Sequence, residues 1–272
     1  MVSIGFVGAG NMARALGGGL ARSASATGAE DAVRLLATDP DPAALERFAR
    51  ETTGEAVADL RALLAASDAV VLAVKPQVLP ALLPEIARAL EPRHLVISIA
   101  AGATLTSLSR GLGGDTRIVR AMPNTPALVR QGITVLVGGA TATRADLELA
   151  ERIFRGAGDV VVLDDERPMD AVTAVSGSGP GFFFAYAEAM LHAAGAVGLP
   201  PELGLRLVQR TLLGSALLWL ESGEPPERLR AMVTSPGGTT QAGLAALDAQ
   251  GFAAAVRSAV EAATRRSREL SA

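Results

Sequence analysis

The segment that most constrains the fold is the hexapeptide GAGNMA at residues 8–13, which follows an apolar run and opens a helical pattern. Two glycines and a small residue at this spacing are typical of the phosphate-binding turn of dinucleotide-binding βαβ folds. The first glycine permits a tight turn, and the second lets a pyrophosphate approach the backbone beside the N–H groups of the helix. A plain strand–helix connector is the alternative interpretation. The residues predicted to bind the cofactor here are Gly8, Ala9, Gly10, Asn11 and Met12.

Short β-rich runs alternate with helical patterns over the first 165 residues. This order predicts βαβ units and a mainly parallel, twisted sheet, and therefore an α/β Rossmann-like domain over residues 1–165. The strands are expected at Ser3–Val7, Val33–Thr38, Ala69–Val74, Leu95–Ile99, Ile118–Ala121, Ile133–Val137 and Val160–Leu163. The helices are expected at Asn11–Ala21, Pro42–Glu51, Leu60–Ala66, Val78–Leu90 and Arg144–Gly156.

The pattern changes after the segment DDERP at residues 164–168, where strand signals stop and long helical stretches begin. A domain boundary is therefore expected near residue 165, with an all-α domain over residues 166–272. The helical stretches 180–197 and 203–220 are too apolar for a solvated surface, which predicts burial against a partner subunit. Charged residues in the middle of both stretches make a membrane span unfavourable.

Composition narrows the possible functions. The formal net charge is −3 with no long run of either sign, so neither nucleic acid nor an anionic membrane is an expected partner. The chain has no cysteine, which excludes disulfides and thiolate chemistry. Its two histidines, His94 and His192, lie outside any recognisable metal or triad motif. No signal-like segment precedes the first strand pattern, so a cytoplasmic location is expected.

An acidic residue at the end of the second strand usually contacts the adenosine ribose in dinucleotide-binding folds. Asp39 is the candidate, although residues 22–31 lengthen the first crossover and place it later than usual. Its carboxylate would accept from the ribose hydroxyls and repel a 2′-phosphate, which weakly favours NADH over NADPH. Alternatively, Asp39 or Asp41 only caps the helix that begins at Pro42.

Two further loops leave the carboxyl ends of predicted strands, where open α/β sheets bind ligands. Their small residues let a nicotinamide ribose pass close to the backbone. Lys75 is a candidate general acid or electrostatic anchor, or only a surface lysine. The proline-rich turn RAMPNTP at residues 120–126 either closes the cofactor pocket or only turns the chain. The residues predicted to line the pocket are Ala73, Val74, Lys75, Pro76, Ala100, Ala101 and Gly102.

The run SPGGTT at residues 235–240 interrupts the helical half of the chain. A glycine-rich turn that leads into a helix offers N–H groups to an anion. By itself, however, the run is better explained as a corner between two helices, with Thr239 as the N-cap.

In its motifs the chain resembles the delta-1-pyrroline-5-carboxylate reductase family. The matching segments are GFVGAGNMA at 5–13, AVKP at 73–76, SIAAG at 98–102, RAMPNTPA at 120–127, DAVTAVSGSGP at 170–180 and MVTSPGGTTQAGLAALD at 232–248. The resemblance implies reduction of 1-pyrroline-5-carboxylate to L-proline with NADPH or NADH. It also implies a helical domain that dimerises through interlocking helices, dimers that often form pentamers of dimers, and an active site between the two domains.

The resemblance assigns the substrate to the SPGGTT run. The residues implied to line the carboxylate and ring of the cyclic imine are Ser235, Gly237, Gly238, Thr239 and Thr240. Thr240 is the catalytic candidate, because it is implied to hydrogen-bond the ring nitrogen. We expect positioning to dominate catalysis, with the proton supplied by a substrate already present as the iminium or by water relayed through Thr240.

Two alternatives remain open on the sequence alone. A β-hydroxyacid dehydrogenase also pairs a Rossmann domain with a helical one, but it is expected to have a catalytic lysine in its second domain. No lysine follows Lys75 in this chain. A non-catalytic dinucleotide-binding sensor would have no need of an imine site.

Overall fold

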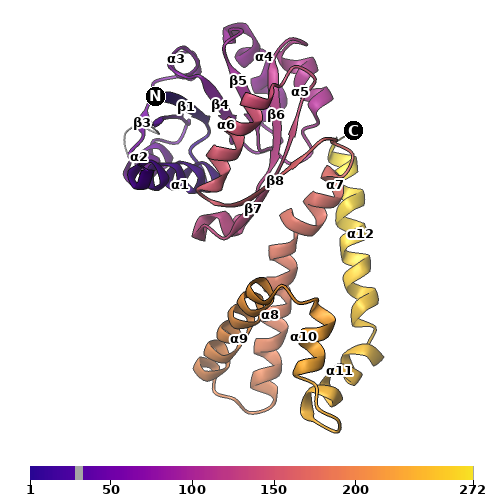
Figure 1. Ribbon diagram of the computed structural model, residues 1–272. Coiled ribbons are helices and arrows are strands. Elements are labelled where there is room, and N and C mark those ends of the chain that lie inside the picture. The colour runs from indigo at the N-terminus through magenta and orange to yellow at the C-terminus, as the bar shows by residue number, and fades with distance from the viewer. Residues whose placement is uncertain (28–32, 272) are drawn as a thin grey trace. The chain divides into compact units, whose positions relative to one another are not determined.

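The computed structural model describes residues 1–27 and 33–271, which form two compact units (Figure 1). The first unit comprises Met1–Ser178 together with Ala263–Ala272, and the second comprises Gly179–Ala262. The boundary between the two compact units therefore lies after Ser178, whereas the change in sequence pattern lies near residue 165. Residues 28–31 of the long first crossover lie outside the described residues.

The first unit is built on an eight-stranded sheet, in the order β3-β2-β1-β4-β5-β6-β7-β8 within the described part of the chain. The strands are β1 (Val2–Val7), β2 (Val33–Thr38), β3 (Glu55–Ala56), β4 (Ala69–Leu72), β5 (Leu95–Ser98), β6 (Arg117–Met122), β7 (Gly132–Gly138) and β8 (Gly158–Leu163). Neighbouring strands are parallel except β6 and β7, which confirms the mainly parallel sheet. The strand order reverses between β1 and β4, which is where open α/β sheets bind ligands.

Helices connect these strands or follow the last of them, and several begin at a capping side chain. They are α1 (Asn11–Thr27), α2 (Pro42–Thr52), α3 (Leu60–Ala66), α4 (Leu79–Ala89), α5 (Leu105–Leu112), a 3₁₀ turn (Thr125–Val129), α6 (Arg144–Arg155), α7 (Met169–Val172) and a π-helical turn (Thr173–Gly177). The side chains of Asp41, Asp59, Thr104 and Thr143 accept backbone N–H groups at the starts of α2, α3, α5 and α6. Such caps satisfy donors that have no partner within the helix.

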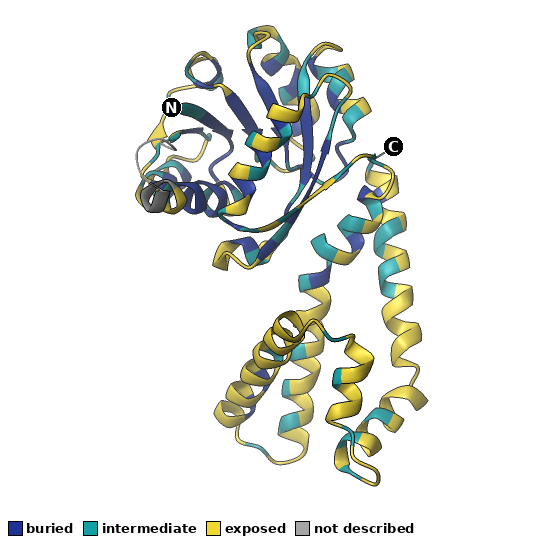
Figure 2. Cartoon of the chain, in the orientation of Figure 1, coloured by how far each residue is buried: buried dark blue, intermediate teal, exposed yellow. Residues whose placement is uncertain are grey.

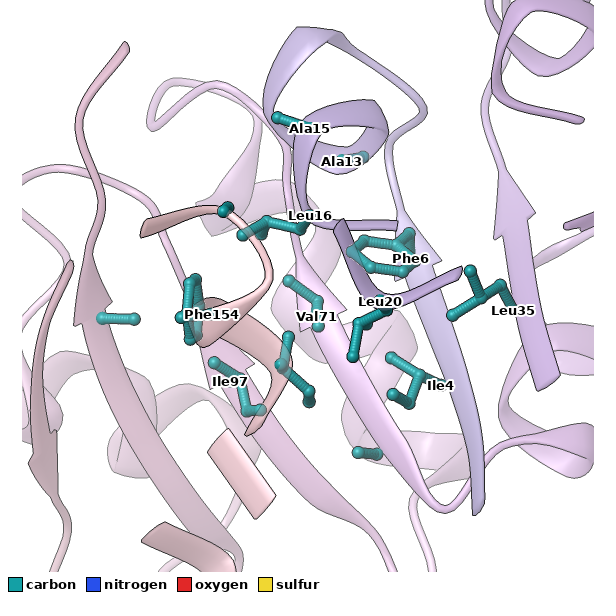
Figure 3. Close-up of a cluster of buried hydrophobic side chains, with 14 of the residues drawn as sticks. Ile4, Phe6, Ala13, Ala15, Leu16, Leu20, Leu35, Val71, Ile97 and Phe154 are labelled. Atoms are coloured by element: carbon teal, nitrogen blue, oxygen red, sulfur yellow. The ribbon is translucent and has the colours of Figure 1, made fainter. Parts of the chain in front are cut away.

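Hydrophobic clusters cover both faces of the sheet. On one face, Phe6 and Val71 of the strands pack with Leu16 of α1 and Phe154 of α6 (Figure 3). On the other face, α3, α4 and α5 supply most of the helical contacts, as with Ile86 of α4. Because helices cover both faces, the central strands are apolar on both sides, as their sequences predicted.

The second unit contains only helices among its described residues. They are α8 (Gly179–Ala196), α9 (Pro201–Ser222), α10 (Pro226–Met232), α11 (Thr239–Ala249) and the first part of α12 (Phe252–Ser271). Figure 2 shows these helices mostly exposed, in contrast to the buried strands of the sheet. Apolar side chains such as Phe183, Phe184 and Leu220 are exposed in the single chain. No helix in the described residues is long and apolar enough to cross a membrane.

The structure refines several sequence-based boundaries. β4 ends at Leu72, so Ala73 and Val74 already belong to the loop that follows the strand. The short strand β3 and the helix α5 were not anticipated, because two residues are too few for a pattern and α5 lies in a glycine-rich stretch. The helix after SPGGTT begins at Thr239, one residue earlier than expected.

Candidate active site

The glycine-rich turn joins the carboxyl ends of three strands. The Gly8 N–H donates to the carbonyl of Thr38 at the end of β2 (2.9 Å), and the Ala73 N–H donates to the carbonyl of Val7 at the end of β1 (2.8 Å). The sheet therefore brings together the turn and the loop after β4, which are about 65 residues apart.

Two glycines of this turn have different physical reasons to lack a side chain. Gly8 has a φ of +98°, and a Cβ atom there would lie 2.7 Å from the carbonyl oxygen of Ala73. A Cβ atom on Gly10, by contrast, would meet no heavy atom within 4 Å. The position beside Gly10 is therefore open to a ligand, whereas Gly8 is required by the turn itself.

The turn also presents to that open position N–H groups that no other described residue pairs with. The backbone hydrogen bond from Arg14 to the Gly10 carbonyl (3.1 Å) closes the first turn of α1. The N–H groups of Asn11, Met12 and Ala13 precede that bond and lie at the positive end of the helix dipole. The predicted phosphate-binding residues thus fit a dinucleotide pyrophosphate.

Asp39 lies against the same turn. Its Oδ2 accepts the N–H of Ala9 at 2.8 Å, and its Oδ1 accepts the N–H of Asp41 at 2.9 Å. The helix cap of α2 is Asp41, which accepts the N–H of Ala43 at 3.0 Å. The carboxylate of Asp39 is therefore held at the glycine-rich turn and does not cap α2.

The two predicted lining loops differ in their surroundings. Lys75 is exposed, and the loop after β5 is largely buried, with Ala100 only 4% exposed. Gly102 has a φ of +79°, and a Cβ atom there would lie 2.9 Å from the carbonyl oxygen of Leu270 in α12. The last turn of α12 thus packs directly on this loop within the first unit.

An ion pair with a buried arginine, beside these loops, was missed by sequence reasoning. Arg120 of β6 donates to Oε1 of Glu166 at 2.6 Å, and the same oxygen accepts the N–H of Leu105 at 2.8 Å. The Arg120 side chain is 4% exposed, and its Nη2 has no hydrogen-bond partner among the described residues. The partners are 46 residues apart, so no local spacing signals the pair.

Asn124 has a structural role in the proline-rich turn. Its Oδ1 accepts the N–H of Ile133 at 2.9 Å, and its Nδ2 donates to the carbonyl of Ser176 at 3.3 Å. The two motifs RAMPNTPA and SGSGP are thereby joined. The side-chain amide of Asn124 is used in these contacts.

The SPGGTT loop lies in the second unit and leads into the N-terminus of α11. Gly237 has a φ of +72°, and a Cβ atom on Gly238 would lie 2.4 Å from Oγ of Ser235. The N-cap of α11 is Gly238, which corrects the expectation of Thr239, and it provides no side-chain cap. The first N–H of α11 bonded within the helix is that of Ala242, to the Gly238 carbonyl (3.2 Å).

The N–H groups of Thr239, Thr240 and Gln241 therefore precede the bonded part of the helix. The N–H of Gly237, immediately before them, donates to Oε1 of Gln241 at 2.6 Å. An anion at this helix entrance meets N–H donors and the positive end of the helix dipole.

The described residues contain no cluster of acidic or histidine side chains suited to a metal ion. His94 is 2% exposed and has a structural role. Its Nδ1 accepts the N–H of Glu91 at 2.8 Å, while Nε2 lies 2.9 Å from the carbonyl of Leu64. The tautomer that fits both contacts carries its proton on Nε2 and donates it to the Leu64 carbonyl.

Family models match both parts of the chain. Residues 166–270 match the model described as pyrroline-5-carboxylate reductase dimerisation, and residues 3–102 match that described as NADP oxidoreductase coenzyme F420-dependent. The pyrroline-5-carboxylate reductase of Pseudomonas aeruginosa is 44% identical over 267 residues, which cover 98% of this chain and 96% of that protein. The Escherichia coli pyrroline-5-carboxylate reductase is 40% identical and covered to 98% in both chains.

Solved structures agree with these relatives. The pyrroline-5-carboxylate reductase of Coxiella burnetii superposes with a TM-score of 0.89 at 36% identity, covering 100% of this chain and 99% of that one. The Plasmodium falciparum pyrroline carboxylate reductase, solved with NADP bound, gives 0.87 at 30% identity, covering 100% and 98%. A prephenate dehydrogenase from Aquifex aeolicus shares only the fold, with a TM-score of 0.55 at 14% identity. The glycine-rich turn, the SPGGTT loop and these full-length similarities lead to one conclusion: the chain belongs to the pyrroline-5-carboxylate reductase family.

Proposed function

We propose that this protein reduces 1-pyrroline-5-carboxylate to L-proline with a reduced nicotinamide dinucleotide, the last step of proline biosynthesis. The observation that carries the proposal is the N-terminus of α11. There the glycine backbone and the N–H groups at the start of the helix can bind a small carboxylate. The relatives named above, which share nearly the whole length of the chain, support the same reaction.

In this proposal the SPGGTT loop binds the cyclic imine. Gly237 and Gly238 let the substrate carboxylate reach the main chain, while Ser235 and Thr239 line the ring. Thr240, in the first turn of α11, hydrogen-bonds the ring nitrogen. When bound, the reduced nicotinamide supplies a hydride to the C=N carbon. The nitrogen gains one proton, either before binding, as the iminium, or from water held by Thr240.

We further propose that NADH is preferred over NADPH. Support comes from Asp39, whose carboxylate is fixed at the glycine-rich turn by the N–H groups of Ala9 and Asp41. A 2′-phosphate near that carboxylate would be repelled. Arg14, a nearby cation in α1, already donates to Asn11 (2.6 Å) and Glu51 (3.2 Å).

The reaction is tested by following the oxidation of NADH and NADPH when 1-pyrroline-5-carboxylate is added. No oxidation with either cofactor would contradict the proposal, and activity on 3-hydroxy acids would favour a β-hydroxyacid dehydrogenase instead. Thr240→Ala should lower kcat about 100-fold while cofactor affinity changes less than twofold, because only the group at the imine nitrogen is lost. Thr240→Ser retains the hydroxyl and should keep most of the turnover.

The chain matches a dimerisation model over residues 166–270, which supports a homo-oligomer. The pentamer of dimers, the domain boundary near residue 165 and the cytoplasmic location stay predictions.

A further inference from the structure

One hydrogen bond in the SPGGTT loop involves a residue that the proposed function does not use. The N–H of Gly237 donates to Oε1 of Gln241 across 2.6 Å. Gln241 is the third residue of α11, so its side chain folds back over the entrance of its own helix. The acceptor thus occupies a backbone donor in the loop that is proposed to bind the substrate carboxylate.

We propose that Gln241 is an internal competitor of the substrate, because its side-chain oxygen takes the Gly237 N–H that the substrate carboxylate needs. This inference rests on the proposed function of the SPGGTT loop. Gln241 would then set how tightly the site holds its anionic substrate and product, without contributing to the chemical step.

The chemistry of the two acceptors explains why the substrate still binds. The oxygen of Gln241 belongs to a neutral amide, whereas the substrate offers a carboxylate. Hydrogen bonds to a charged acceptor are roughly twice as strong as those between neutral groups. The substrate also gains the dipole of α11 and the N–H groups of Thr239 and Thr240, which the amide does not engage.

The surroundings of Gln241 allow its side chain to leave. The residue is exposed, and it lines a hollow of about 700 Å³ in the helical unit, together with Thr234, Leu244 and Phe252. Release of the Gly237 N–H therefore requires no packed side chain to move. A neutral hydrogen bond of this kind shifts an equilibrium by about two- to tenfold, which is the expected size of the competition.

Two substitutions that keep the approximate shape of Gln241 test whether it competes with the substrate or only supports the loop structure. Gln241→Met removes the strong acceptor, and Gln241→Glu replaces it with a charged acceptor that holds the N–H more tightly and repels the substrate. We expect the KM for 1-pyrroline-5-carboxylate to rise in the order Met, Gln, Glu. The dissociation constant of L-proline, measured by calorimetry on the whole chain, should follow the same order.

We expect the KM for 1-pyrroline-5-carboxylate to be about two- to tenfold lower in Gln241→Met and more than tenfold higher in Gln241→Glu. The kcat should change less than the KM. The KM of the cofactor should not follow this order. Gln250→Met, at the other end of α11, is the matched control and should leave all constants unchanged.

Each other outcome has a separate meaning. If Gln241→Met raises KM and lowers the melting temperature, Gln241 supports the loop and the competition is disproved. If both variants match the parent while Thr240→Ala lowers kcat about 100-fold, the competition alone is wrong. If Thr240→Ala also has no effect, the loop does not bind the substrate, and the proposed site itself fails.

Discussion

At the scale of single residues, the two glycines of the glycine-rich turn are expected to have different roles: Gly8 in folding and Gly10 in cofactor binding. Gly8→Ala places a Cβ atom against the Ala73 carbonyl at a positive φ, so we expect a loss of about 2 kcal/mol or more in the free energy of unfolding. Gly10→Ala meets open space and should keep the melting temperature while weakening NADH binding at least tenfold. Thermal melts and NADH fluorescence titrations measure both. A Gly10→Ala variant that binds NADH normally would contradict the phosphate site.

The proposed preference for NADH likewise rests on one side chain. Asp39→Asn keeps an oxygen acceptor for the Ala9 N–H but removes the charge. We expect the ratio of kcat/KM for NADPH to that for NADH to rise about tenfold, which corresponds to about 1.4 kcal/mol. Asp41→Asn, which alters the cap of α2, is the control and should leave the ratio unchanged. Initial rates with both cofactors give the answer, and an unchanged ratio in Asp39→Asn would refute the preference.

At the scale of elements, an exposed side-chain pair adds to the backbone pairing of the short edge strand β3 with β2. Arg34 of β2 donates two hydrogen bonds to Glu55 of β3, at 3.1 and 2.7 Å. The hydrogen bond from Arg34 lowers the pKa of Glu55. A carboxyl group with a lowered folded-state pKa stabilises the fold above its unfolded pKa and loses that contribution as the pH falls through the folded value.

The stability difference between the parent and Glu55→Gln should therefore be present at neutral pH and vanish in acid. Both groups are solvent-exposed, so the effect on the melting temperature is expected to be small. Melting curves from pH 7 to pH 2 measure it, with Glu148→Gln, in an exposed pair on α6, as the control for general acid effects. A constant difference across this range would contradict the role of the pair.

The elements that the sequence predicted well are those with strong periodicity. β1, β2 and β5 lie within one or two residues of their expected positions, because each contains a buried run of apolar residues. α5 was missed, since its sequence LTSLSRGL is short and contains glycine. Its start depends on the Thr104 cap and on Glu166, which lies 61 residues away from Leu105.

At the scale of the whole molecule, the helical unit is incomplete as a single chain. Phe183 is 68% exposed and Leu220 is 76% exposed, which matches the dimerisation model for this region. Large exposed apolar surfaces of this kind are covered by partner subunits. Phe183→Glu should therefore shift the protein toward monomer in analytical ultracentrifugation.

Trp219, the single tryptophan, gives a second measure of this association. It is 53% exposed in the chain alone, so its emission should shift to the red when dimers dissociate on dilution. The melting temperature of the parent should rise with protein concentration, since association stabilises the folded state by mass action. Emission and melting temperature that are both independent of concentration would contradict the expected dimer.

The sequence by itself determined the α/β class, the helical second half and the two glycine-rich segments, because periodicity and glycine spacing are local properties of the chain. Only the tertiary structure decided which of these residues meet. It placed the carboxylate of Asp39 on the N–H of Ala9, and paired Arg120 with Glu166. It also showed that Gln241 takes the Gly237 N–H. Such contacts depend on backbone directions and strand register, which no local pattern of residue types encodes.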